Sequence, residues 1–229
     1  MVQLSYDRQT LNAVNPLARY AHRHRLRTSI KLASQKYRSG LILDYGCGSG
    51  AFVAEMCKRL PGVAVGYEPY MTEVNSNDIR IYRSQADLLR GGPYGMVTLF
   101  ETIEHLTMDE LVEFLTICRQ ILSPSADQSG GILISGPIEV GPALVLKEFN
   151  RSVMRLRKPE HGLLEFLNAS VLGVAAHRAP DIKCSHKGFD FRVAIQTLRD
   201  LGWHVDVLAY GPLPTNTWYG NSQFYLWAS

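Results

Sequence analysis

The stretch that most constrains the fold is LILDYGCGSGAF, Leu41 to Phe52, in which an apolar run leads into three glycines at alternate positions. The apolar run predicts a buried strand over Leu41–Gly46, and apolar residues at four-residue spacing predict a helix over Ser49–Leu60. A strand that passes into a helix through a glycine turn is typical of α/β folds. In these folds the backbone of that turn approaches a ligand closely.

The alternation of strands and helices continues along the chain. Further strands are predicted over 63–69, 79–84, 95–103, 130–137, 204–210 and 223–229, and helices over 15–37, behind a capping box at Thr107–Glu110, and over 191–201. This alternation predicts an α/β fold with a mostly parallel sheet and right-handed crossovers. The loop before the last strand is too short for a helical crossover, so that strand is expected to be antiparallel to its neighbour.

Length and composition favour one globular domain over residues 1–229. Hydrophobic residues make up 46% and charged residues 20% of the chain, and no apolar run has the length of a signal peptide or a membrane span, so we expect a cytoplasmic protein. Residues 1–39 are expected to form an N-terminal helical segment. Residues 138–187 fit no β-α unit and are expected to form a partly helical cap at the ligand-binding edge of the sheet. The four cysteines lack metal-ligand spacing, and no metal is expected.

Two segments carry clusters of basic residues. Residues 1–40 hold eight Lys or Arg against one acid, Asp7, which fits either an anionic ligand or nucleic acid, or simply a solvated helix face. In the cap, basic residues recur at helical spacing: Lys147, Arg151, Arg155 and Lys158. Such a stripe suits a phosphate-bearing acceptor or an anionic membrane surface, but a solvated face explains it equally well.

Three acidic residues lie at or just after the ends of predicted strands. Glu68 lies 18 residues after Gly50, where a carboxylate can accept hydrogen bonds from both hydroxyls of an adenosine ribose. This position fits either NAD or S-adenosylmethionine. Asp44 directly precedes the turn, where it would repel a pyrophosphate but attract a cationic amino-acid group. Asp87 follows the third predicted strand and is a candidate acceptor for the adenine amino group.

Four segments in order, LDYGCGSG, VGYEP, QADLL and VTLFETIEHL, resemble the class I S-adenosylmethionine-dependent methyltransferases. The last segment resembles the ubiquinone-type, small-molecule branch, whose fourth strand is followed by a Glu-His-Leu or similar triplet. The resemblance implies a Rossmann-like three-layer sandwich with a seven-stranded sheet, to which the helical cap is added, and S-adenosyl-L-methionine as the cofactor. It also implies a set of cofactor-binding residues: Asp44, Gly46, Cys47, Gly48 and Gly50 for the methionine part, Glu68 and Pro69 for the ribose, Asp87 and Leu88 for the adenine, and Phe100 along the cofactor.

Methyl transfer is an in-line displacement that needs a protein base only if the acceptor must lose a proton. Histidines are the candidate bases, foremost His186 and His105, with His161 in the cap as a third. Glu101 and Glu104 flank this region. One of them could orient His105 or bind substrate, and capping of a helix is the simpler role.

Several functions remain open at this point. The leading hypothesis is methylation of O or N in a small molecule, such as a sugar or a phosphate-bearing metabolite. RNA or protein methylation is the main alternative, although no RNA-binding module and no Asn-Pro-Pro-Tyr-type motif is present, so no stable nucleic-acid partner is expected. An NAD-binding oxidoreductase would need a Tyr-x-x-x-Lys pair placed for hydride chemistry, which the sequence lacks. A non-catalytic domain that binds the cofactor is the fourth hypothesis.

Overall fold

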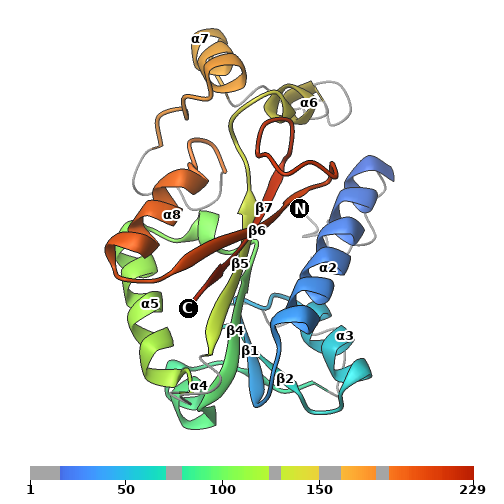
Figure 1. Ribbon diagram of the computed structural model, residues 1–229, viewed down its shortest axis with the longest axis vertical. Helices are drawn as coiled ribbons and strands as arrows, with labels where there is room; N and C mark the ends of the chain where they lie inside the picture. The colour runs from blue at the N-terminus through green and yellow to red at the C-terminus, as the bar shows by residue number, and fades with distance from the viewer. Residues whose placement is uncertain (1–15, 71–78, 124–129, 150–160, 179–185) are drawn as a thin grey trace. The chain divides into compact units, whose positions relative to one another are not determined.

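The computed structural model describes residues 16–70, 79–123, 130–149, 161–178 and 186–229 (Figure 1). Seven strands form one sheet in the order β3-β2-β1-β4-β5-β7-β6. Their bounds are β1 Leu41–Tyr45, β2 Ala64–Tyr67, β3 Ile81–Tyr82, β4 Tyr94–Phe100, β5 Gly131–Pro137, β6 Val205–Gly211 and β7 Gln223–Ala228. The pairs β1–β2, β1–β4 and β2–β3 are parallel, and β6–β7 is antiparallel. The predicted α/β sheet with an antiparallel last strand is therefore confirmed.

The helices are α2 Pro16–Lys36, α3 Ala51–Arg59, α4 Gln85–Gly91, α5 Met108–Ile121, α6 Ala143–Phe149, α7 Leu163–Leu167 and α8 Phe191–Asp200. The predicted capping box precedes α5, because the Thr107 N–H donates to Glu110 Oε2 at 2.8 Å and the Glu110 N–H donates to Thr107 Oγ1 at 3.3 Å. Helix α4 was not predicted. Its N-cap is Ser84, whose hydroxyl accepts the Asp87 N–H. The QADLLR segment is too short for the spacing of its apolar residues to indicate a helix.

Strand β4 ends at Phe100, three residues before the predicted end. Glu101 has a φ of 51°, the left-handed region, so the backbone leaves the strand there and enters the 3-10 helix η1 (Ile103–His105). The predicted strand over 95–103 is wrong at this end, because the apolar run does not reveal the turn at Glu101.

The chain divides into two compact units. The first comprises residues 1–100, 113–134 and 229, and the second comprises residues 101–112 and 135–228. The expectation of a single domain over residues 1–229 stays a prediction. No helix within the described ranges is both long enough and apolar enough to span a membrane.

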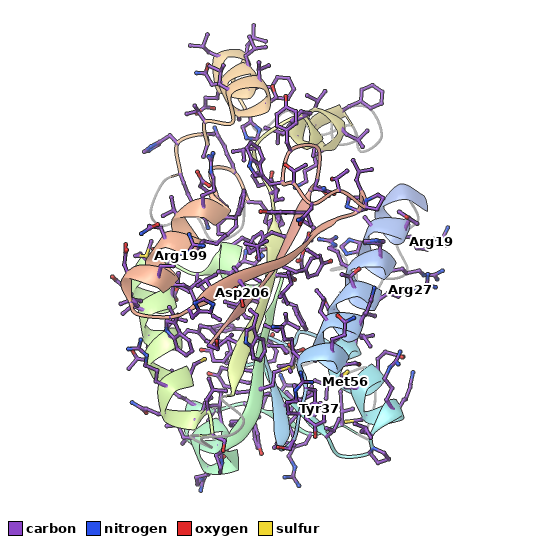
Figure 2. The ribbon with its side chains drawn as sticks, in the orientation of Figure 1. Arg19, Arg27, Tyr37, Met56, Arg199 and Asp206 are labelled. Carbon is purple, nitrogen blue, oxygen red and sulfur yellow. The ribbon has the colours of Figure 1, made fainter. Side chains whose placement is uncertain are left out.

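In the first unit, helices cover both faces of the sheet. Helices α2 and α3 lie on one face and α5 lies on the other (Figure 1). Strand β1 is apolar because both of its faces are covered: Ile42 and Leu43 are fully buried. Met56 of α3 is buried in the core, whereas Arg19 and Arg27 project outward from α2 (Figure 2).

In the second unit, α8 packs its apolar face against the hairpin of β6 and β7. The ring of Phe191 lies 5.3 Å from that of Phe224 on β7, centroid to centroid. Helices α6 and α7 and the π-helix η3 (Asn168–Leu172) lie within the segment expected to form the cap. Of the predicted basic stripe, Lys147 lies on α6, whereas Arg151, Arg155 and Lys158 lie outside the described residues.

Candidate functional site

The turn after β1 has a conformation that only glycine adopts readily. Gly46, Gly48 and Gly50 have φ angles of 74°, 54° and 82°, all in the left-handed region. The N–H groups of Gly46 and Cys47 both donate to Tyr67 O, at 2.8 and 3.1 Å, which ties the turn to the end of β2. Gly50 is the N-cap residue of α3, and its lack of a side chain leaves the start of this helix without a side-chain cap.

Asp44 lies at the end of β1 and is 3% exposed. Thr98 on β4 is its partner in the strand register, and the Thr98 hydroxyl donates to Asp44 Oδ1 at 2.7 Å. Burial raises the pKa of Asp44 to about 7, the Thr98 hydrogen bond opposes this shift, and the charge of Glu68 adds to it. Within the described residues, no basic side chain is among the influences on this pKa.

Glu68 ends β2 and is oriented by backbone groups on both sides. Its Oε2 accepts the Gly48 N–H at 3.1 Å, and its Oε1 accepts the Tyr70 N–H at 3.0 Å. The side chain is buried with the glycine turn.

Two further residues at the predicted site have environments that suit packing. Burial raises the pKa of the Cys47 thiol, and the charges of Asp44 and Glu68 raise it further, so Cys47 is a neutral thiol at physiological pH. Phe100, at the end of β4, makes an edge-to-face contact with Phe52 of α3 at 4.8 Å between ring centroids.

The residues expected to flank the adenine differ from one another in exposure. Asp87 lies in the first turn of α4, where its carboxylate accepts from the Ser84 hydroxyl at 2.6 Å and from Arg90 at 2.5 Å. The Ser84 hydrogen bond and Arg90 lower the pKa of Asp87. The Leu88 side chain is fully buried, and Pro69 is exposed.

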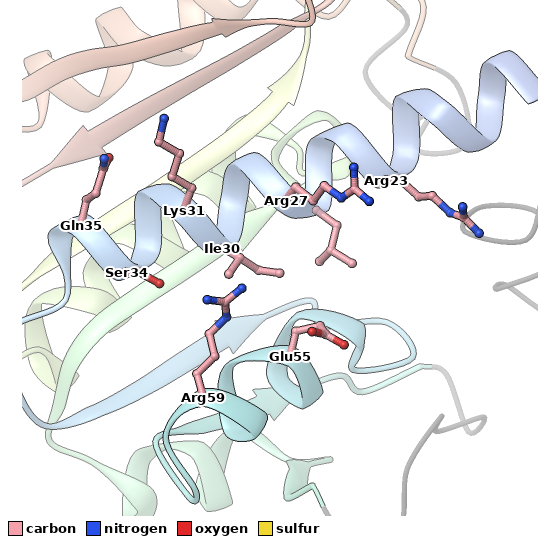
Figure 3. A pocket seen from close by; sticks show the side chains of 9 residues that line it. Arg23, Arg27, Ile30, Lys31, Ser34, Gln35, Glu55 and Arg59 are labelled. Carbon is pink, nitrogen blue, oxygen red and sulfur yellow. The ribbon is translucent and has the colours of Figure 1, made fainter.

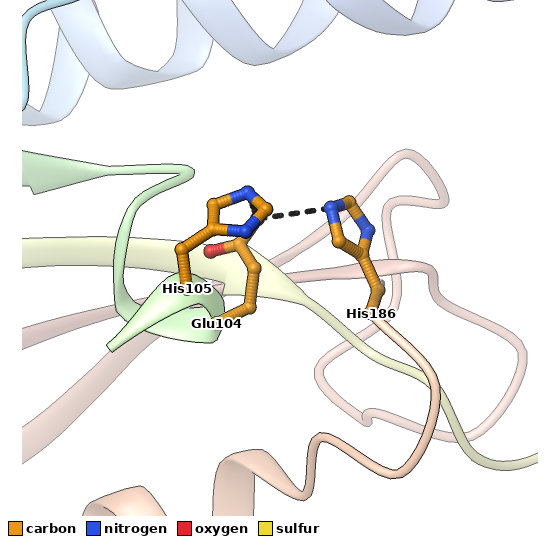
Figure 4. Close-up of side chains that lie close together, drawn as sticks. All are labelled: Glu104, His105 and His186. Atoms are coloured by element: carbon orange, nitrogen blue, oxygen red, sulfur yellow. Dashed lines mark ion pairs between the residues drawn. The ribbon is translucent and has the colours of Figure 1, made fainter. Parts of the chain in front are cut away.

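The second unit brings together the two histidines predicted to be catalytic. His105, at the end of η1, and His186, in the segment before α8, have ring centroids 5.2 Å apart (Figure 4). Glu104 Oε1 lies 3.9 Å from His105 Nε2 and 3.7 Å from His186 Nε2. The Glu104 side chain is 1% exposed, whereas the histidine side chains are 39% and 40% exposed. The third candidate, His161, is buried, with its Nδ1 2.9 Å from Glu148 Oε1.

Glu139 lies just after β5 and next to His186. Its Oε1 lies 3.8 Å from His186 Nδ1 and accepts from Lys147 Nζ at 2.8 Å. Burial alone would raise the pKa of Glu139, but the Lys147 ammonium and the His186 hydrogen bond lower it to about 2. Lys147 also donates to the Ile138 carbonyl at 2.8 Å. Its charge is therefore engaged by Glu139 and does not extend a basic surface.

Each unit contains a cavity. In the second unit, a cavity of about 480 Å³ is lined by His105, Arg178, Phe189 and Asp190, among others. In the first unit, a cavity of about 750 Å³ lies between α2 and α3 and is rich in basic side chains: Arg23, Arg27, Lys31 and Arg59, with Glu55 as the acid (Figure 3).

The family of the chain follows from a comparison with known protein families. A family model described as a methyltransferase domain matches residues 17–179. The chain belongs to the methyltransferases of this family. The methyltransferase has the class I fold and uses S-adenosylmethionine as its cofactor, as the resemblance implied. No curated protein sequence matches it.

Solved structures share the fold of this methyltransferase. A SAM-dependent methyltransferase from Archaeoglobus fulgidus is 15% identical, with a TM-score of 0.55, and the alignment covers 93% of this chain and 99% of that one. A cyclopropane-fatty-acyl-phospholipid synthase-like protein from Lactobacillus casei is 11% identical, with a TM-score of 0.59 and 94% coverage of each chain. The plantazolicin methyltransferase BpumL, in complex with a triazolic desmethylPZN analog and SAH, is 11% identical, with a TM-score of 0.56 and coverage of 95% and 86%.

The sequence reasoning overlooked two residues of the methyltransferase that contact the predicted site residues. Thr98 holds Asp44, and its signal was available: it is the one polar side chain in the apolar core of β4. Glu139 stands behind His186 and comes two residues after β5 ends, at a position where α/β folds place functional groups.

Proposed function

We propose that this methyltransferase transfers a methyl group to an oxygen or nitrogen atom of a small molecule. The observation that carries the cofactor part of the proposal is the buried Asp44 beside a turn of three left-handed glycines. Bound S-adenosylmethionine supplies an electrophilic methyl group on a positively charged sulfur. The chain then has to bind this cation, orient it and exclude water.

Asp44 and the turn would hold the methionine part of the cofactor. The carboxylate of Asp44 would pair with the cofactor ammonium, which is the positive charge that its buried surroundings lack. The N–H groups in the first turn of α3 would receive the cofactor carboxylate. Gly46, Cys47, Gly48 and Gly50 contribute backbone to this site, so their side chains matter through their small size.

Glu68 would accept hydrogen bonds from the ribose hydroxyls. Its orientation by the Gly48 and Tyr70 N–H groups supports this role, because a carboxylate already fixed in place loses little freedom when the ribose binds. We further propose that Pro69 lies beside the ribose, that Asp87 and Leu88 flank the adenine, and that Phe100 lies along the cofactor.

We place the acceptor beside His105 and His186. Their rings are partly exposed, and His105 lines the cavity of about 480 Å³, which has the size of a small-molecule site. An imidazole nitrogen there could take a proton from the acceptor. The complex of BpumL with a triazolic desmethylPZN analog agrees with an acceptor of that size class. A phosphate-bearing acceptor has less support, because Lys147 is paired with Glu139.

Titration calorimetry with S-adenosylhomocysteine tests the cofactor part, with NAD as the control. We expect the first ligand to bind with one site per chain and NAD to give no heat of binding. Binding of NAD alone would show that the glycine turn serves a dinucleotide and would remove the proposed role of Asp44. Binding of neither would leave the chain without the activity proposed.

One observation favours RNA as a second candidate substrate. The cavity between α2 and α3 is lined by four basic side chains and one acidic side chain, which suits a phosphate backbone. Affinity for a short RNA, measured by fluorescence anisotropy at several salt concentrations, tests it. A steep fall of affinity with salt would support this candidate, and weak binding at low salt would exclude it.

A further inference from the structure

The cluster of Glu104, His105 and His186 combines two imidazoles with a carboxylate, and two histidines acting as catalytic bases would not need the carboxylate. One ligating atom from each of the three side chains lies within 4.8 Å of the other two. Figure 4 shows the Glu104 carboxylate next to the His105 ring, with the His186 ring facing both from a segment far away in the sequence. Two imidazoles and one carboxylate with open positions form a donor set that binds zinc or iron(II) in other proteins. We propose that Glu104, His105 and His186 bind a divalent transition-metal ion.

The distances suit an ion after a small inward movement. Two atoms that each lie about 2.1 Å from one ion are about 3.0 to 3.4 Å apart at octahedral or tetrahedral angles. The Glu104 oxygen lies 3.7 Å and 3.9 Å from the two Nε2 atoms. Each histidine therefore needs to approach the carboxylate by less than about 1 Å, which a rotation of a partly exposed ring supplies.

Burial of the carboxylate favours a cation. Glu104 is 1% exposed, and an ionised carboxylate at such a position is stable only beside positive charge. Arg178 provides part of it, because its guanidinium donates to the Glu104 carbonyl. The competing explanation is that Arg178 and the two histidines stabilise the Glu104 carboxylate without a metal ion. Titration with a metal ion distinguishes these two explanations.

Glu139 adds the outer contact that metal-binding histidines usually have. A histidine that binds a metal through one nitrogen commonly directs the other toward a carboxylate or carbonyl. His186 has this arrangement, because its Nε2 faces Glu104 and its Nδ1 lies 3.8 Å from Glu139 Oε1. Lys147 in turn holds Glu139 in place at 2.8 Å. The arrangement assigns Nε2 of His186 to the ion.

The ion would leave at least one coordination position for water or for an oxygen of a bound molecule. A hydroxyl bound there loses its proton to solvent more easily, because a divalent ion stabilises the oxygen anion. This consequence rests on the proposed function and narrows the acceptor to a molecule that presents a hydroxyl oxygen. Metal binding itself does not depend on the methyl-transfer chemistry. The proposed metal site differs from the expectation, drawn from the spacing of the cysteines, that the chain binds no metal.

Cobalt(II) titration of the purified full-length protein, treated with chelator beforehand, tests the site by visible absorption. We expect saturation at one ion per chain and displacement of cobalt by zinc. Glu104→Gln and His186→Asn should each weaken binding at least 100-fold, and Glu139→Gln should weaken it about 10- to 100-fold. His204→Asn is the matched control, because His204 also lies near a carboxylate, at 3.3 Å from Asp206, but is 75% exposed and outside the cluster.

Calorimetry with S-adenosylhomocysteine on the same variants shows that they are folded and tests the proposed function separately. Unchanged cofactor affinity together with lost cobalt binding would support the metal site. Absence of saturable cobalt and zinc binding in the unmodified protein would overturn it, as would binding that survives both Glu104→Gln and His186→Asn. In either case, binding of S-adenosylhomocysteine would leave the proposed methyltransferase function intact.

Discussion

Replacing Asp44 by Asn should stabilise the cofactor-free protein at alkaline pH while weakening cofactor binding. The pKa of Asp44 rises from 3.8 to about 7 in the folded protein, mainly through burial. A shift of about 3 units, at about 1.4 kcal/mol per unit, means that the ionised carboxylate costs the fold about 4 kcal/mol at pH 8. Asn has nearly the same shape, and its carbonyl oxygen can still accept from Thr98, so the substitution removes the charge and little else.

The sign of the pH dependence follows from the raised pKa. The folded protein keeps the Asp44 proton to higher pH than the unfolded chain does, so the free energy of unfolding falls as pH rises from 3.8 to about 7. Asp44→Asn has no ionisable group at this position, so its free energy of unfolding does not fall with pH for this reason. Between pH 5 and pH 8, its stability relative to the unmodified protein should therefore increase by about 2 to 3 kcal/mol.

Urea unfolding at pH 5, 6.5 and 8 without cofactor measures this difference, and calorimetry with S-adenosylhomocysteine measures the loss of binding. Asp206→Asn is the matched control, because it makes the same chemical change at a side chain that is 52% exposed, and it should alter neither quantity. A stability difference that is independent of pH would refute the raised pKa. Unchanged affinity for S-adenosylhomocysteine would refute the role of Asp44 in cofactor binding.

Three further experiments probe the other parts of the first unit. Glu68→Ala should weaken binding of S-adenosylhomocysteine by about 1 to 3 kcal/mol in calorimetry, the range for charge-assisted hydrogen bonds, and equal affinity would show that the ribose lies elsewhere. Gly50→Ala should lose more stability and more cofactor affinity than Gly62→Ala. Both glycines have left-handed φ angles, so both substitutions strain the backbone. An added Cβ at position 50 would also lie 2.3 Å from an isoleucine methyl, whereas at position 62 it would meet nothing within 4 Å. If Arg27 and Lys31 contact RNA phosphates, replacing both with Ala should reduce the salt dependence of RNA affinity by about two charges, and an unchanged slope would exclude this surface.

The elements that could be predicted from the sequence are those with local signals. The turn after β1 follows from three glycines, and the three left-handed φ angles show why no other residue would serve. The start of α5 follows from Thr107 and Glu110, whose reciprocal hydrogen bonds need only a four-residue segment. The antiparallel β7 follows from the length of one loop. Each of these features depends on residues that are neighbours in the chain.

The features that escaped prediction depend on residues brought together by the sheet. Asp44 contacts Thr98 because β1 and β4 are adjacent in a particular register. The order of the strands in the sheet cannot be predicted from the residues of either strand. His186 lies near Glu104 and Glu139 because three segments far apart in the sequence come together in the fold. Its place just before a helix at the ligand-binding edge indicated a functional histidine, but it did not indicate which acidic residues would be its neighbours.

If Asp44 and Glu68 bind the cofactor as proposed, these two buried acids would let the chain distinguish it from other adenosine-containing molecules. Burial and the charge of Glu68 both raise the pKa of Asp44, so both oppose its ionisation in the cofactor-free protein. A cationic ammonium relieves this repulsion, and binding below pH 7 should then release a proton from Asp44 and weaken up to about tenfold per pH unit. A pyrophosphate would instead add negative charge to the same place. On this proposal, the instability that ionised Asp44 causes in the cofactor-free protein would be the source of its selectivity for a cation.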